Sequence, residues 1–303
     1  MSQERLLQMV ISVLIMADFE VSDRCDIRPR SFDLVSKRGD LILIIKVVSH
    51  IDSVSEDVAS DLSLIAWHLR GSPLIIGEKT RDAELERGAV YLRNGINAMN
   101  VATLYDDLVE GIPPLVYASP GGLYVNIDGE LLRSLRERHQ MSLGDLAHLL
   151  GVSRRTISKY ESGMGTTLDI AIKLEGIFDT AVVEALDPFR YEKTPSERVS
   201  PEPETCLRDL ERMGIELHAM QRAPFQALAM YHEETILTGY GPAQKIVRRA
   251  ALIGNISEIT STRAMCVIKN YHKQKKVGKT LVIGEDTLHT LEDGTELIQL
   301  IDE

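Results

Sequence analysis

The chain has 303 residues, of which 44% are hydrophobic and 26% charged, and its formal net charge is −11. At roughly 150 residues per domain this length allows two or three domains, and the composition is that of a soluble globular protein. No apolar run approaches the ~18 residues of a membrane span, and the acidic Glu4 lies inside the first apolar stretch, so we expect neither a signal peptide nor a membrane segment. The scattered Cys25, Cys206 and Cys266 lack C-x-x-C spacing. They indicate reduced, buried thiols in a cytoplasmic protein without a disulfide framework, metal site or cofactor.

Residues 1–112 have the pattern of an α/β domain. Apolar residues recur at intervals of three and four in its first helix, and Asn94-Gly95 is a strong hairpin signal. The expected elements, in order, are a helix over 3–17, a strand near 19–21, a hairpin of strands 32–36 and 41–48, a helix over 53–69, a strand over 73–77, a hairpin of strands 90–92 and 96–98, and a helix over 102–110.

This order of elements resembles the core of the PD-(D/E)xK nuclease superfamily, especially archaeal Holliday-junction resolvases. In that family an early helical Glu, a strand Asp and a later Glu-x-Lys gather around Mg²⁺. The resemblance places Glu4, Asp33 and Lys46 on three of these positions, whereas Ile44 stands where the Glu of Glu-x-Lys is expected. Because a hard divalent cation needs more than one carboxylate, we expect a retained fold without catalysis. A repaired metal site is one alternative, and an unrelated domain with solvated charges is another.

Residues 113–128 form a connector that begins at Pro113-Pro114. Two short apolar runs surround Ser119-Pro120-Gly121-Gly122 and predict a β-hairpin. The hairpin could act as a wing beside DNA or as a brace against the N-terminal domain. Because it carries almost no positive charge, bracing is the favoured interpretation.

The most informative stretch, within residues 129–187, predicts two helices joined by a tight turn. Ser142 is a good N-cap, and Asp145 can complete a capping box. Gly151 ends the first helix, where positive φ costs little, and Ser153 caps the second. The small Ala147 allows the two helices to cross closely. These features specify a helix-turn-helix.

The second of these helices carries basic and hydroxyl side chains outward. The stretch resembles the lambda-repressor/Cro family of DNA-binding domains, which implies five helices between about 131 and 186, the last near 181–186. Arg154, Arg155 and Lys159 are expected to contact base edges in the major groove. Hydroxyl groups near the helix starts are expected to hold or approach phosphates, and the residues that carry them are Ser142, Ser153, Thr156 and Ser158. Leu143 replaces a Gln that is common in the family.

The charge distribution supports this assignment. Residues 1–128 hold 12 basic and 19 acidic side chains, whereas residues 129–163 hold six basic and four acidic ones. A small cationic surface flanked by acidic regions should bind DNA with modest affinity per monomer. We therefore expect a homodimer.

The remaining chain is expected to be a linker and a second α/β domain. Residues 188–205 contain four prolines and many charges, which is typical of an exposed linker. Residues 206–303 repeat the order of elements of the first domain, with Gln226 in place of Asp33 and no recognisable counterpart of Lys46. Two unrelated domains with similar patterning are the alternative.

The predicted fold class is therefore mixed α/β and all-α, with a central five-helix lambda-repressor-like domain between two α/β restriction-endonuclease-like domains. The combination resembles an archaeal family of helix-turn-helix regulators, which implies a sequence-specific transcriptional regulator of double-stranded DNA. A dimer would place two recognition helices about 34 Å apart on a pseudo-palindromic operator. The alternatives are a metal-dependent, junction-processing nuclease targeted by the helix-turn-helix, and an interaction protein whose α/β domains serve as platforms.

Overall fold

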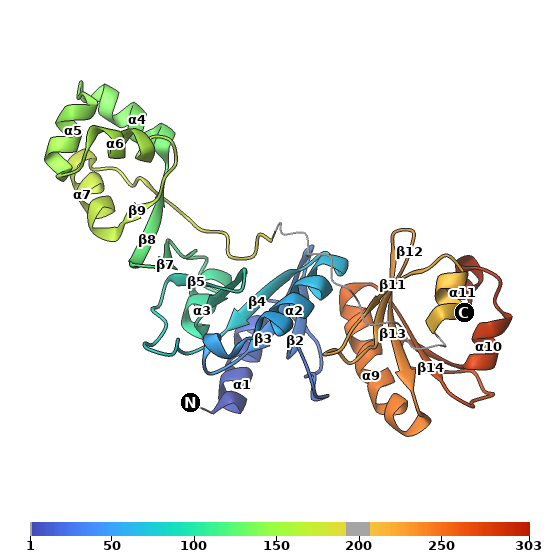
Figure 1. Ribbon diagram of the computed structural model, residues 1–303. Coiled ribbons are helices and arrows are strands. Elements are labelled where there is room, and N and C mark those ends of the chain that lie inside the picture. Colours follow the sequence, from blue (N-terminus) through green and yellow to red (C-terminus); the bar gives the residue numbers. More distant parts are fainter. Residues whose placement is uncertain (1, 192–206) are drawn as a thin grey trace.

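A computed structural model describes residues 2–191 and 207–303. Figure 1 shows two α/β halves side by side and a small helical domain that projects from the N-terminal half. None of the helices in these ranges is long and apolar enough to cross a membrane.

The N-terminal half is a mixed sheet covered by helices on both faces. Its elements are α1 (Gln3–Met16), β1 (Glu20–Val21), β2 (Leu34–Arg38), β3 (Leu41–Val47), α2 (Glu56–His68), β4 (Ser72–Ile76), β5 (Ala89–Arg93), β6 (Ile96–Met99) and α3 (Val101–Leu108). The strand order is β1-β2-β3-β4-β6-β5. Alternate residues of β3 face opposite layers: Leu43 and Ile45 pack with α1 and α3, whereas Ile42 and Ile44 pack with α2.

The C-terminal half repeats this topology strand for strand. Its elements are α8 (Arg208–Arg212), β11 (Glu216–Ala219), β12 (Ala227–Tyr231), β13 (Glu234–Gly241), α9 (Ala243–Thr260), β14 (Arg263–Ile268), β15 (Lys275–Val277), β16 (Thr280–Gly284), α10 (Glu285–Thr290) and α11 (Gly294–Asp302). The strand order is β11-β12-β13-β14-β16-β15, with the same parallel and antiparallel pairings as in the first half. The sequence predicts separate helices over 243–253 and 256–262, but the structure has the single helix α9, which continues through the buried Gly254.

The two halves share one hydrophobic core. Side chains of α2 and α9, together with the sheet faces beneath them, belong to a single buried cluster. Ion pairs between the halves lie beside it. Arg222 of the C-terminal half pairs with Asp57 and Asp61 of α2, and Arg248 of α9 pairs with Asp26 of the N-terminal half. The α/β halves are therefore each other's packing partners within one chain.

The central domain contains α4 (Gly129–Arg138), α5 (Leu143–Leu150), α6 (Arg154–Tyr160), β9 (Thr166–Thr167), α7 (Leu168–Phe178) and β10 (Val183–Glu184). Residues 129–187 are all described and hold four helices. The expected fifth helix near 181–186 is wrong, because Val183 and Glu184 pair antiparallel with a strand of the connector. β-Branched valines suit such a pairing better than a short helix.

The connector is a hairpin of β7 (Val116–Ser119) and β8 (Gly122–Ile127) that joins the central domain to the N-terminal sheet. β7 pairs parallel with β5 through two residue pairs, while β8 pairs with β9 and β10. Val125 and Ile127 of β8 are buried in the core of the central domain. The hairpin therefore lies between the N-terminal sheet and the central domain, in the position of a brace.

The first residues of the predicted linker are held against the N-terminal half. The Asn97 side chain donates to the carbonyl of Pro188 (Nδ2 to O, 2.8 Å), and the Ser72 hydroxyl donates to the carbonyl of Phe189. Phe189 also packs against the core beneath α1 and α3. Of the expected linker 188–205, residues 192–205 lie outside the described residues, as does Cys206.

The buried thiols are as expected for structural cysteines. Cys25 and Cys266 are buried and unpaired with each other. Burial raises the pKa of Cys25 to about 11 and that of Cys266 to about 12. Both thiols are therefore protonated at neutral pH, which disfavours their reaction as nucleophiles.

A half-buried carboxyl group near the end of α3, that of Asp107, makes stability depend on pH. Burial, and next the charge of Asp187, raises the pKa of Asp107 to about 6, and its Oδ2 has no hydrogen-bond partner in the described part of the chain. The folded protein therefore holds a proton there that the unfolded chain releases near pH ~4, so stability falls as pH rises between about 4 and 6.

We expect Asp107→Asn to stabilise the protein by about 1 kcal/mol at pH ~7.5, after allowance for the partial exposure of the carboxyl group. The gain should shrink as the pH falls and vanish below pH ~3, where Asp107 is protonated in both states. Thermal unfolding across this pH range measures it, with the exposed Asp179→Asn as control. A stabilisation independent of pH would contradict the assignment to Asp107 ionisation.

Candidate DNA-binding surface and the Asp33 cluster

Local sequence signals fix the turn between α5 and α6. The Ser142 hydroxyl accepts from the Asp145 amide (3.2 Å), and the Asp145 carboxylate accepts from the Ser142 amide (2.8 Å), which confirms the predicted capping box. Gly151 ends α5 at φ +71°, as expected for a left-handed C-cap. Ala147 is buried in the helix contact. The predicted helix-turn-helix is therefore present.

The outward face of α6 is open to solvent. Arg154, Arg155, Ser158 and Lys159 are exposed and Thr156 is half-buried, whereas Ile157 and Tyr160 point into the domain core. Figure 1 shows this helix on the part of the chain that projects away from both α/β halves. The predicted base-contacting side chains are thus together on one accessible surface.

The predicted phosphate-contacting hydroxyls lie at helix starts or on α6. Ser142 and Ser153 are the N-caps of α5 and α6, where backbone N–H groups favour anions. The Ser153 hydroxyl accepts from the Thr156 amide (3.1 Å) and lies 2.8 Å from the Thr156 hydroxyl. Ser158 is exposed one turn further along α6.

Arg154 leans back across the first turn of α5. A Cβ atom added to Gly144 would come within 2.9 Å of Arg154 Nε, so the glycine makes room for this guanidinium group. The hydrogen bonds from Ser142, and to a smaller extent the charge of Arg154, keep the pKa of Asp145 below its usual value. Leu143 packs against the domain core. Arg154 therefore spans the N-termini of both helices, whereas Arg155 and Lys159 project from α6 alone.

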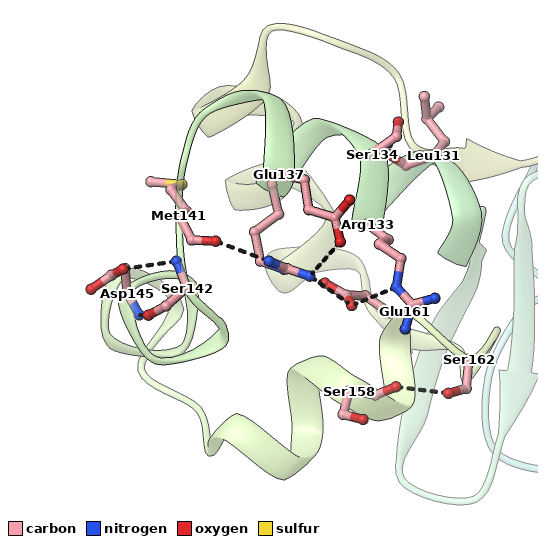
Figure 2. Close-up of polar contacts among 11 residues, drawn as sticks. Leu131, Arg133, Ser134, Glu137, Met141, Ser142, Asp145, Ser158, Glu161 and Ser162 are labelled. Atoms are coloured by element: carbon pink, nitrogen blue, oxygen red, sulfur yellow. Dashed lines mark hydrogen bonds and ion pairs between the residues drawn. The ribbon is translucent and has the colours of Figure 1, made fainter.

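A buried ion pair between Arg136 of α4 and Glu161 at the end of α6 connects the two helices (Figure 2). Arg136 donates to Glu161 twice, from Nε (2.5 Å) and Nη2 (3.2 Å), and from Nη1 to the carbonyl of Met141 (2.9 Å). The side chains of Arg136 and Glu161 are only 11% and 4% exposed. Arg136 is thus a buried structural residue of the domain. Glu161 is buried with it, so leaving this pair out of the surface charge of residues 129–163 does not change the excess of basic side chains. No local sequence signal indicates this partner 25 residues away.

The nuclease-like residues of the N-terminal half do not form an open acidic site. The Asp33 carboxylate pairs with Arg30 (Nε to Oδ1, 2.6 Å) and Lys46 (Nζ to Oδ2, 3.3 Å), and its Oδ2 also accepts from the Val47 amide (2.8 Å). We call Arg30, Asp33 and Lys46 the Asp33 cluster; their side chains are 10%, 1% and 12% exposed. Glu4 is engaged elsewhere, with Arg24.

The Asp33 cluster does not fit a catalytic magnesium ion. Two cations already occupy the carboxylate oxygens, and Ile44, in the position of the missing Glu, is fully buried in the core shared by the two halves. Burial lowers the pKa of Lys46, and the Asp33 charge opposes this effect. Across the described ranges, no three His, Cys, Asp or Glu side chains are grouped to hold a metal ion.

The second half keeps the backbone geometry of this cluster without its charges. The Asp33 amide donates to Ile45 O, and the Gln226 amide donates to Thr238 O, both at 2.8 Å. The Gln226 Oε1 accepts from the Tyr240 amide (2.7 Å), just as Asp33 accepts from Val47. Gly239 therefore occupies the position of Lys46, which the sequence pattern alone did not reveal.

These features define the class of protein: a helix-turn-helix protein that carries a nuclease-like α/β fold. The family model for a PD-(D/E)XK superfamily domain matches residues 3–114, and that for a helix-turn-helix matches residues 132–184. No solved structure matches the chain.

Relatives match over the entire length. The chain is 64% identical to a protein of Methanoculleus marisnigri, with all of both chains covered, and 39% identical to one of Methanosarcina mazei, with 100% of this chain and 98% of the relative covered. A protein of Methanocella arvoryzae is 41% identical over 99% of this chain and 96% of its own length. All three bear the name "Putative HTH-type transcriptional regulatory protein". The chain belongs to this archaeal family of helix-turn-helix regulators.

Proposed function

We propose that this protein is a sequence-specific transcriptional regulator that binds double-stranded DNA as a homodimer through α5 and α6. The observation that carries the proposal is the exposed basic face of α6, set on a helix-turn-helix that projects from the rest of the molecule. The helix-turn-helix match and the names of the relatives support it.

The roles of the residues follow from their positions. Arg155 and Lys159 point outward from α6 and suit contacts to guanine O6 and N7 in the major groove. Arg154, which lies over Gly144, can reach a base edge or a phosphate beside the start of α5. Ser142, Ser153, Thr156 and Ser158 place hydroxyl groups where phosphates approach in this docking mode.

The acidic remainder of the chain shapes the expected affinity. A net charge of −11 repels DNA outside the basic face, so non-specific binding should be weak and strongly dependent on salt. Two recognition helices about 34 Å apart would restore affinity on a pseudo-palindromic site.

Selection from genomic DNA fragments tests the proposal. We expect the full chain to enrich one common motif with two inverted halves, and the logarithm of its affinity to fall linearly with the logarithm of salt concentration. Enrichment without a shared motif would exclude sequence-specific binding.

The PD-(D/E)XK match makes a metal-dependent nuclease the second candidate. The occupied Asp33 cluster argues against it, because a metal ion would have to displace both Arg30 and Lys46. We expect no cleavage of duplex or branched DNA with Mg²⁺ or Mn²⁺. Cleavage that depends on metal and disappears in Asp33→Ala would overturn this conclusion.

The third candidate is an interaction protein with α/β platforms, and it has less exposed surface for partners than the sequence suggested. The faces of both sheets that carry α2 and α9 are buried in the contact between the halves. A further partner must therefore bind elsewhere.

A further inference from the structure

The outer face of α1 and α3 forms an apolar groove on the N-terminal half. The groove has a volume of about 530 Å³, and its lining includes Met9, Ser12 and Met16 of α1 and Val101, Ala102 and Tyr105 of α3. It lies on the sheet face opposite to α2. Because the C-terminal half packs on the α2 side, the groove points away from it.

The exposed face of α1 carries three large apolar side chains among its polar ones. Met9, Ile15 and Met16 are 37%, 60% and 54% exposed, although the opposite face of α1 already fills the core with five buried residues. A solvated helix face normally carries charged or polar side chains. Contiguous exposed apolar surface of this kind marks an interaction site.

The side chains along α1 would complement those of a second copy of α1 that runs antiparallel to it. If two copies of α1 crossed antiparallel with Ser12 at the centre, Met9 of one copy would lie opposite Ile15 of the other. The small Ser12 permits close approach of the helices. Arg5, seven positions before Ser12, would lie near Asp18, six positions after it; both are exposed. The opposite charges at the two ends favour this antiparallel orientation.

We propose that this groove is the self-association surface, and that its occupant is α1 of a second copy of the chain. This assignment rests on the proposed function in so far as operator binding uses a homodimer, but the surface itself can be tested without DNA. The interface is isologous, since each copy offers its α1 to the groove of the other.

Sedimentation velocity of the full chain tests the surface. We expect Met16→Glu to weaken self-association at least about tenfold, because Met16 lines the apolar groove and the dimer would place the new charge there twice. The matched control is Ile172→Glu on α7, which changes a similarly exposed apolar residue (60%) of the helix-turn-helix domain and should leave the dimer intact. Thermal unfolding verifies that each variant is folded.

A charge exchange tests the antiparallel orientation. Arg5→Glu and Asp18→Lys should each weaken self-association, and the double variant should restore it. A monomeric wild-type chain, a dimer lost only in Ile172→Glu, or a double variant no better than the single ones would overturn the proposal. Binding of a half-operator separates the two hypotheses: Met16→Glu should retain it as a monomer, whereas Arg155→Ala should lose it and remain a dimer.

Discussion

Replacing Arg155 with alanine is expected to remove most of the sequence preference of the protein. Arg155 is exposed in the first turn of α6, the part of a recognition helix that approaches base edges. A bidentate contact to guanine contributes about 1–3 kcal/mol of discrimination, so affinity for the selected motif should fall by about ten- to a hundredfold. Affinity for unrelated duplex DNA should change much less. Titration of both DNAs at several salt concentrations measures the ratio.

The control for Arg155→Ala removes the same charge elsewhere in the domain. Lys173 is exposed on α7, outside the proposed surface, and Lys173→Ala should leave the ratio between specific and non-specific binding unchanged. If Arg155→Ala weakened binding to all sequences equally, Arg155 would be a phosphate contact and the base-reading role would pass to Lys159 or Arg154.

Glu161→Gln is expected to destabilise the helix-turn-helix domain by about 3–5 kcal/mol. The substitution removes the only buried counter-charge that the described residues offer to the Arg136 guanidinium, and breaking one partner of a buried pair typically costs this much. Because Arg136 also donates to Met141 O beside the start of α5, its displacement should loosen the α4–α5 connection as well. DNA binding should be lost together with the fold of the domain.

Calorimetry combined with hydrogen exchange measures this effect, since exchange can assign the loss to α4–α6. Glu137→Gln is the matched control, because Glu137 also pairs with Arg136 (3.5 Å) but is 63% exposed; surface pairs of this kind contribute about 0–1 kcal/mol. Arg136→Met and the double variant complete a double-mutant cycle. A loss for Glu161→Gln no larger than for Glu137→Gln would show that the pair is not what holds α4 to α6.

The local parts of the helix-turn-helix could be predicted from sequence because their causes are local. Ser142, Asp145 and Gly151 act on the backbone within a few residues, so their pattern carries nearly all the information. The fifth helix predicted near 181–186 was wrong because the structure there is determined by a distant part of the chain. Its partner strand β8 lies more than fifty residues earlier, and no local signal indicates that pairing.

That the Asp33 cluster does not fit a metal ion was only partly predictable from the sequence. The loss of a carboxylate at Ile44 was visible in the motif, but the role of Arg30 was not, since the motif of Glu, Asp and Glu-x-Lys has no position for it. The burial of Ile44 depends on packing between two halves separated by the entire helix-turn-helix domain. Contacts between segments so far apart in the sequence produce no hydrophobic periodicity in either segment that would identify the other.

The matching strand order of the two halves has a consequence for symmetry. Two identical subunits must change together, because any substitution appears in both. Here the paired folds lie in one polypeptide, so one can keep Asp33 and Lys46 while the other holds the neutral Gln226 and Gly239. One half can also carry a helix-turn-helix domain that its counterpart lacks. Because the chain has a single such domain, the proposed binding to a pseudo-palindromic site requires a second molecule to supply the two-fold symmetry.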